Sequence, residues 1–304
     1  MDPRPRTPPR IARLLTAVVS LVLVGSVGGA ASAFAPLPFF YDLHTFRGDD
    51  GTTAVVAAVA VPVKELRREL YQGRVRYRFD IRFVLTDTVR REVIERIDSV
   101  YVSRPAALPR RHLLHTVLEI PSPPSDAIFQ RIVVTDATRP GVGQLYQTPF
   151  TIPDYGGTEL MLSDIAFGLP DATRGWQRRG ETLALLPTSQ FPRSAFDVYY
   201  EVYNLPPSRP YSTEIAIAPI DDDGEENVDE TVRVLFSGDS RADDSGVFSE
   251  LRRLESQLSR GRYRVTVTVT DQADGRVATR SRVIEVRGTR GGATLVPALP
   301  KRGG

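Results

Sequence analysis

Two histidines three residues apart, His112 and His115, have a spacing that could serve metal binding, because an H-x-x-H pair on one helix face can hold an ion. Most residues from there to Ile120 are apolar, which is typical of a strand. On a strand this spacing points the two rings to opposite faces, and the remaining histidine, His44, is distant in sequence. The pattern therefore argues against a histidine metal site.

A second candidate is the acidic segment from Asp221 to Glu230, which contains seven carboxylates. Calcium takes oxygen ligands from flexible loops of this kind. However, Asp221, Asp222 and Asp223 are adjacent, and calcium loops of known type place their acids at alternate positions. We predict a solvated loop, with calcium binding as the alternative.

Signals of catalysis are few. The chain has no cysteine, so thiol catalysis, cysteine-ligated zinc and disulfides are excluded. Neither Ser189 nor Ser194 lies in a G-x-S-x-G turn, and no phosphate-binding glycine loop is present. We predict a protein that is not an enzyme and uses no cofactor. A hydrolase with an unmarked carboxylate pair is an alternative, because sequence alone does not reveal such a pair.

Aromatic residues give the strongest binding signal. If Phe196, Tyr200 and Val202 face a core, then Tyr199 and Tyr203 face outward together on the same strand. Such a pair could stack on a sugar or anchor a protein partner. The alternative, which we favour, is that the first domain or the segment containing Trp176 covers both rings.

The elements that position these residues are strands. From Arg74 to Thr86, apolar and mainly charged residues alternate with a period of two, which predicts a strand with one buried face. The same alternation runs from Tyr263 to Thr270, followed by a turn at Asp274-Gly275 and a last strand. Ser259 to Tyr263 has the form of a tyrosine corner, in which the hydroxyl binds an upstream backbone group.

An internal repeat organises the chain. Ile132 to Asp136 matches Val267 to Asp271 at an offset of 135 residues, and the strand beginning near Val75 matches the one beginning at Phe196 at an offset of 121. These matches predict an all-β protein of two tandem immunoglobulin-like antiparallel sandwiches. The expected divisions are a leader at 1–33, sandwiches at 34–153 and 154–287, with 154–190 partly between the domains, and a disordered tail at 288–304. Two short segments remain as helix candidates: Val63 to Tyr71 and Val247 to Leu258.

The first 33 residues are typical of a secretory signal peptide. Four arginines precede a 14-residue, mainly apolar run from Leu14 to Val27, and an Ala-x-Ala exit ends at Ala33. An uncleaved anchor is the alternative, but the run is shorter than the roughly 20 residues of a membrane-spanning helix. Removal of the leader, which carries four arginines and one aspartate, takes the net charge from +2 to −1. Nucleic acid is therefore not an expected partner, and membrane contact is expected only during export.

Two stretches carry a family resemblance: Leu160 to Ala166, and Tyr199 to Leu205. They resemble the N-terminal β-rich region of bacterial exported GWxTD-domain proteins. The motif that names this family is not present at Trp176, which is followed by Gln-Arg-Arg, and we expect no GWxTD domain in this sequence. The resemblance implies an exported, immunoglobulin-like, non-enzymatic protein and no catalytic residues.

Together these patterns predict a periplasmic or secreted β-sandwich protein that acts as a binding or structural module of the bacterial envelope. Its expected partner is an envelope protein or a glycan. A carbohydrate-binding or adhesion module, assisted by calcium, is the alternative function.

Overall fold

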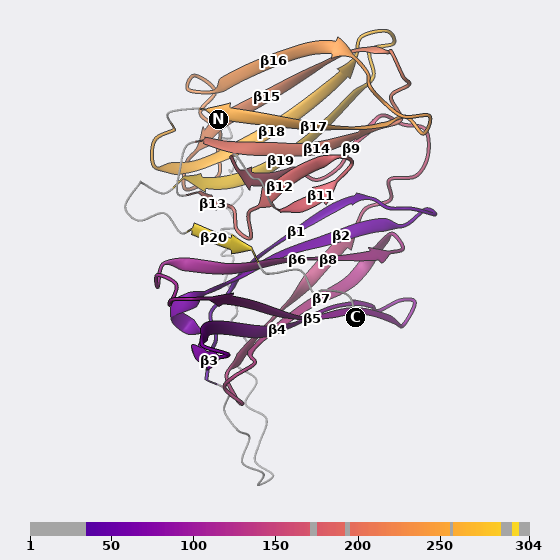
Figure 1. The fold of residues 1–304 in the computed structure, drawn as a ribbon. Helices are drawn as coiled ribbons and strands as arrows, with labels where there is room; N and C mark the ends of the chain where they lie inside the picture. Colours follow the sequence, from indigo (N-terminus) through magenta and orange to yellow (C-terminus); the bar gives the residue numbers. More distant parts are fainter. Residues whose placement is uncertain (1–34, 171–174, 192–194, 256–257, 287–293, 298–304) are drawn as a thin grey trace, which may run out of the picture. The chain divides into compact units, whose positions relative to one another are not determined.

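The computed structural model describes residues 35–170, 175–191, 195–255, 258–286 and 294–297. The expected leader lies outside these residues, and the chain from Phe34 onward forms one compact unit. Its elements are sheets with mainly antiparallel pairing and one short 3-10 turn, η1 (Val63–Glu65), so the all-β prediction is confirmed (Figure 1). Within the described residues, no helix has the length and apolar character needed to cross a membrane.

The first sandwich consists of two sheets. Sheet 1A has the strand order β1-β2-β6-β20 and sheet 1B the order β3-β4-β7-β8, with β5 also paired to β4. The strands of sheet 1A are β1 (Phe40–Arg47), β2 (Thr53–Pro62), β6 (His112–Ser122) and β20 (Thr294–Pro297). The strands of sheet 1B are β3 (Glu69–Tyr71), β4 (Arg74–Asp87), β5 (Glu92–Arg104), β7 (Ser125–Asp136) and β8 (Gly143–Ile152).

The second sandwich is built in the same way. Sheet 2A has the order β11-β12-β10-β14-β17, with β9 also paired to β14, and sheet 2B the order β13-β19-β18-β15-β16. The strands of sheet 2A are β9 (Met161–Leu162), β10 (Ala166–Leu169), β11 (Trp176–Arg178), β12 (Glu181–Leu185), β14 (Ala195–Tyr203) and β17 (Val247–Glu255). The strands of sheet 2B are β13 (Gln190–Phe191), β15 (Pro210–Ile220), β16 (Val232–Asp239), β18 (Gly261–Asp271) and β19 (Val277–Val286).

Each sandwich has its own core because its strands alternate apolar and polar residues. On β4, Tyr77, Phe79, Ile81 and Phe83 are buried and pack against apolar residues of sheet 1A. On β18, the side chains from Tyr263 to Val269 alternate in the same way and fill the second core. The first core takes residues from Leu37 to Ile152 and the second from Leu160 to Val286.

The topology confirms one half of the predicted repeat and corrects the other. β7 and β18 hold the same place in sheets 1B and 2B, and each ends in a buried aspartate, Asp136 or Asp271. However, β14 lies in sheet 2A, whereas β4 lies in sheet 1B, so their match at an offset of 121 is wrong. The counterpart of β4 is β15: Phe79 pairs with Asp136, and Tyr211 with Asp271. Alternation identifies a strand, but it does not specify the sheet to which the strand belongs.

Three local predictions also need correction. Val247 to Leu258 is a strand at its start, β17, because pairing with β14 along nine residues overrides its helical character. Of Val63 to Tyr71, only η1 is helical, and β3 takes its end. In the expected disordered tail, Thr294–Pro297 forms β20 in parallel with β6, because β6 offers an open sheet edge, while 288–293 and 298–304 lie outside the described residues.

Candidate functional site

The structure does not expose Tyr199 and Tyr203, so the predicted partner-binding surface at these residues is wrong. Both side chains are fully buried. The ring of Tyr199 packs edge-on against Phe46 of β1, at 5.8 Å between centroids, and against Trp176 of β11, at 5.5 Å. The favoured alternative therefore holds: the first sandwich and the Trp176 segment cover the strand.

The β11–β12 hairpin delivers Trp176 to this position. Its turn consists of Arg179 and Gly180, which both have positive φ, 46° and 80°. Two-residue turns of this type match the twist of the flanking strands, and glycine adopts such φ values without strain. A Cβ atom on Gly175 would collide with the backbone of Leu183, so glycine is also required where the hairpin begins.

Between the two tyrosines lies a buried carboxylate, Glu201. Its Oε1 accepts hydrogen bonds from the Tyr199 hydroxyl at 2.8 Å and from Arg178 Nε at 2.5 Å. Its Oε2 accepts from the Tyr203 hydroxyl at 2.8 Å and from Arg178 Nη2 at 3.3 Å. We call these four residues the Glu201 clasp. Each carboxylate oxygen thus has two donors, which offsets the desolvation of a buried charge.

The Glu201 clasp joins the two sandwiches. Arg178 also donates to the Arg47 carbonyl at 2.6 Å and to Glu119 Oε1 at 3.3 Å, both in the first sandwich. The Arg47 backbone N–H donates to the Tyr203 hydroxyl at 2.8 Å. The apolar contact beside the clasp takes small residues from β2 and larger ones from sheet 2A. Its members are Phe46, Ala54, Val56, Ala58, Ala166, Trp176, Leu183, Leu185 and Tyr199.

The electrostatics of the clasp favour neutral tyrosines. Burial first, and then the negative charge of Glu201, raise the pKa of Tyr199 and of Tyr203 far above its usual value. The Glu201 charge and the hydrogen bond to it also raise the pKa of Arg178, although burial alone would lower that pKa. Two phenols that stay protonated and a permanently charged guanidinium suit a structural joint better than proton transfer.

A second polar junction forms at the edge of the second sandwich. Arg280 and Arg282 project from β19, Arg280 toward Asp164 and Arg282 toward Asp42 of β1. Arg282 Nη1 also lies 2.7 Å from His44 Nδ1 and donates to the Ile165 carbonyl at 3.0 Å. An open groove of about 430 Å³ runs along these residues. Its two arginines are already paired with carboxylates, which leaves the groove without an uncompensated charge for a ligand.

His44 is neutral in this junction. Burial first, and then the positive charge of Arg282, lower its pKa well below the usual value for histidine. A neutral ring lets Nδ1 accept from the arginine. His44 therefore helps to join the sandwiches and is far from the other two histidines in sequence, as expected.

His112 and His115 lie on β6, so the strand prediction for this segment is confirmed. Being three positions apart, they point to opposite faces of sheet 1A, and His115 is buried. Burial lowers the pKa of His115 to about 4. The described residues contain no group of three or more histidine, aspartate or glutamate side chains placed to hold a metal ion.

The acidic segment Asp221 to Glu230 connects β15 and β16. Asp221 closes its own turn, since its carboxylate accepts the Glu225 backbone N–H at 2.9 Å. Glu226 pairs with Arg264 of β18 at 2.9 Å. Most of the remaining side chains are exposed, which agrees with the predicted solvated loop.

Buried carboxylates elsewhere in the described residues also have structural partners. Asp271 accepts from Arg209 Nε at 3.0 Å and Arg276 Nη2 at 2.8 Å, and Asp136 caps the equivalent turn of the first sandwich through Thr138 and Arg139. Although burial alone would raise the pKa of Asp271, its hydrogen bonds hold it far below the usual value. Asp197 and Glu250 bond to Arg253 and Tyr211, respectively.

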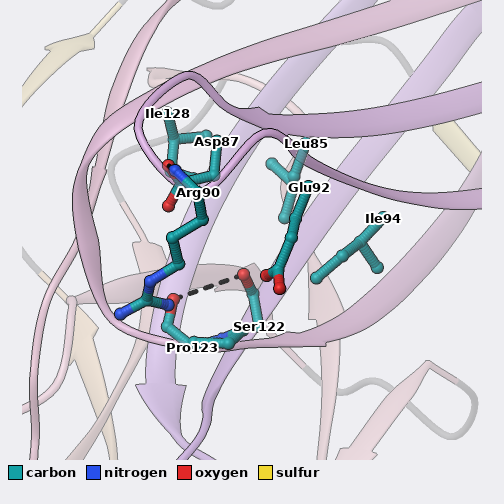
Figure 2. Close-up of a pocket in the computed structure, with 8 residues that line it drawn as sticks. All are labelled: Leu85, Asp87, Arg90, Glu92, Ile94, Ser122, Pro123 and Ile128. Atoms are coloured by element: carbon teal, nitrogen blue, oxygen red, sulfur yellow. Dashed lines mark hydrogen bonds between the residues drawn. The ribbon is translucent and has the colours of Figure 1, made fainter.

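The sixth buried carboxylate, Asp87, lines the small pocket of Figure 2, between the β4–β5 turn and the β6–β7 loop. Asp87 Oδ1 accepts the backbone N–H groups of Val89 and Arg90, at 2.9 and 2.8 Å. The pocket holds about 10 Å³, room for one water molecule at most. Asp87 therefore stabilises the turn, and the pocket is too small to bind a substrate.

The surface with a binding character is the outer face of sheet 1B. Four apolar side chains on it are 39–62% exposed: Val93 and Ile97 on β5, Phe129 on β7 and Leu145 on β8. The strand register places four outer-face residues in one row across β5, β4, β7 and β8: Ile97, Arg82, Val133 and Leu145. Alternation along the strands does not reveal this face, because it identifies the buried positions of each strand and not the chemistry of the intervening ones.

The outer face of sheet 2B also exposes apolar side chains, Leu235, Val277 and Val283, at 37–67%, but hydroxyl groups lie between them. Hydroxyl side chains pair across it, Thr266 with Ser281 at 2.9 Å and Thr268 with Thr279 at 3.2 Å. Gln272 donates to Ser212 beside them, at 2.7 Å. Both outer faces are therefore partly apolar, and they differ in the groups between the apolar residues: arginines such as Arg82 and Arg131 on sheet 1B, and hydroxyl groups on sheet 2B.

No protein-family model matches the chain, and no curated protein sequence matches it. Among solved structures it is similar to the β-glucuronidase of Bacteroides uniformis, at 9% identity over 77% of this chain and 26% of that chain, with a TM-score of 0.25. Red sea bream transglutaminase matches at 11% identity over 81% and 31% of the two chains, with a TM-score of 0.22. A 1.5-MDa bacterial ice-binding adhesin matches at 12% identity over 84% and 65%, with a TM-score of 0.23. The chain spans less than two thirds of the length of each of these proteins.

Proposed function

We propose that the chain is an exported, non-catalytic binding or structural module of the bacterial envelope, in which two sandwiches form one rigid support for a binding face on sheet 1B. The proposal rests on the structural role of the buried carboxylates. In the described residues, each of the six buried carboxylates closes a turn or joins strands or sandwiches.

The binding face is the outer face of sheet 1B, defined by Val93, Ile97, Phe129 and Leu145. Exposed apolar side chains grouped on one face favour association with a protein, and arginines such as Arg82 and Arg131 between them add polar contacts. An envelope protein is therefore the proposed partner. With Tyr199 and Tyr203 buried, the glycan hypothesis has lost the aromatic pair on which it rested.

Export is the second part of the proposal and rests on the N-terminal pattern of arginines, apolar run and Ala-x-Ala exit. Kinship with the exported GWxTD-domain proteins belongs to the same proposal. Its support is the resemblance of Leu160 to Ala166 and of Tyr199 to Leu205.

Site-specific photocrosslinking in a bacterial host tests both parts. A photoreactive residue at Leu145 reports on the outer face of sheet 1B, and the matched control is one at Val283, on the outer face of sheet 2B. We expect protein adducts from the first position and none from the second. Fractionation and N-terminal sequencing should find the chain in the periplasm or medium, beginning at Phe34.

Two results would contradict the proposal separately. A chain that keeps Met1 and stays in the cytoplasm refutes export. Equal adduct patterns from Leu145 and Val283 refute the binding face, because they would reflect random collisions.

A further inference from the structure

β5 is the longest unprotected edge strand in the described part of the chain. It pairs with β4 along all 13 of its residues, and no described strand pairs with its other edge. An edge of this kind presents a row of unpaired backbone N–H and C=O groups to any strand of suitable sequence.

The first half of β5 is exposed on both faces. Val93 and Ile97 on the outer face are 62% and 59% exposed, and Arg96 on the inner face is exposed as well. In this half only Ile94 packs against the first core, whereas Val100 and Val102 in the second half are core residues that hold β5 in its sandwich.

The edge strands β1 and β17, at eight and nine residues, are shorter than β5, and the edges of β6, β8 and β16 are less suited to pairing. β6 already carries β20 along His112–His115, and β8 contains Pro149, which lacks a backbone N–H. β16 contains Gly238, which weakens a strand. β5 contains neither proline nor glycine.

The sequence of β5 is complementary to itself when it is reversed about Ile97. We propose that two copies of the chain pair antiparallel through their β5 edges, with a two-fold axis at Ile97. In this register Arg96 of each copy faces Asp98 of the other, so opposite charges meet twice. The remaining pairs bring no like charges together: Ile97 with Ile97, Ile94 with Val100, Val93 with Tyr101, Glu95 with Ser99, and Glu92 with Val102.

The registers centred on Glu95, Arg96 and Asp98 lack this complementarity. Directly opposed residues of two antiparallel strands point to the same face of the sheet. For two identical strands to keep their outer faces on the same side, the two-fold axis must therefore pass through a residue and not between two residues. Centring on Arg96 or on Asp98 places that charge against its own copy. Centring on Glu95 does the same and also sets Glu92 against Asp98.

The proposed register defines the architecture of the dimer and the range of its dissociation constant. It joins two copies of sheet 1B into one continuous sheet, with both outer faces open on the same side, and sets Val93 and Ile97 beside side chains of the partner strand. Because strand pairing alone buries less than the roughly 1,200 Å² of a standard interface, we expect a micromolar dissociation constant. The inference does not depend on the proposed function.

Reversal of the charge at Arg96 or at Asp98 tests the register. In Arg96→Glu, and separately in Asp98→Arg, like charges meet twice across the axis, and we expect dimerisation about thirty-fold weaker. An equimolar mixture of the two variants should recover the affinity, because a heterodimer restores opposite charges at both positions. The double variant should also dimerise. The matched control is Arg233→Glu on β16, the equivalent strand of sheet 2B, which should leave dimerisation unchanged.

Sedimentation velocity of the full chain over about 1–300 µM measures these affinities, and circular dichroism confirms that each variant folds. A chain that is monomeric across this range overturns the proposal. A dimer that is insensitive to both single reversals, or single variants that weaken it and fail to recover when mixed, overturns the register and with it the β5 interface.

Discussion

Replacement of Glu201 by glutamine probes the joint between the two sandwiches. The change keeps the shape of the side chain and removes its charge. One of the two acceptor oxygens becomes an amide N–H₂ group, which then faces a tyrosine hydroxyl and an Arg178 N–H. The tyrosine hydroxyl is able to turn and accept, but the arginine has only donors.

The expected loss follows from the burial of the pair. Glu201 has a fully buried side chain, and that of Arg178 is 13% exposed, so water compensates little of the lost attraction. Breaking a buried ion pair by changing one partner costs about 3–5 kcal/mol, and hydrogen bonds to charged groups contribute about 1.5–3 kcal/mol each. Glu119, at 3.3 Å, remains as a weaker partner for Arg178. We therefore expect about 3 kcal/mol of lost stability, equivalent to about 6–12 °C in Tm.

Urea denaturation and calorimetry measure the loss. The control is Glu214→Gln, which breaks an exposed pair with Arg233 and should cost less than about 0.5 kcal/mol. Hydrogen exchange adds a local measurement, because the Arg47 backbone N–H donates to the Tyr203 hydroxyl and should exchange faster in Glu201→Gln.

A loss of less than about 1 kcal/mol with unchanged exchange at Arg47 would refute this account. The clasp would then contribute no more than a surface ion pair, and the apolar contact beside it would have to hold the sandwiches together.

Two further predictions concern single residues. His115 has a folded pKa of about 4 against about 6.5 when unfolded, so its contribution to stability is complete above pH 6.5 and is lost as the pH falls toward 4. His115→Leu should remove up to about 3 kcal/mol of this pH dependence, measured as unfolding free energy from pH 7 to 4; an unchanged pH slope would count against burial as the cause. In the second sandwich, Tyr263→Phe removes the 2.9 Å bond from the hydroxyl to the Ser259 carbonyl and should cost about 1 kcal/mol in urea titrations. Tyr71→Phe, on a half-exposed ring, is its control, and equal losses from the two changes would show that the corner contributes nothing specific.

The tyrosine corner shows how far local sequence reasoning reaches. Gly261 and Tyr263 are close in sequence to the Ser259 carbonyl that the hydroxyl binds, so the motif is readable from a few residues. The alternation of β4 and β18, the hairpin at Asp274-Gly275 and the strand character of His112 to Ile120 are local in the same sense.

The burial of residues at the joint between the sandwiches depends on contacts that are not local in the sequence. Tyr199 and Tyr203 occupy positions that alternation assigns to an outer face, and their burial depends on Phe46, more than 150 residues earlier, and on the Trp176 hairpin. β2 is buried along its whole length because one face meets the first core and the other meets sheet 2A. Glu201 gives no signal in the sequence: Tyr199 and Tyr203 flank it on one face of β14, but Arg178, the charge that makes its burial possible, reaches it only through the fold.

The sequence by itself determined the all-β class, the two cores and the turn and corner motifs, because each depends on side chains a few residues apart on one strand or in one turn. Tertiary structure alone decided which strands share a sheet, which outer faces are covered, and which charged side chains are buried in ion pairs that join the sandwiches. These outcomes depend on contacts between residues far apart in the chain, and the period of a strand carries no information about what will lie against its second face.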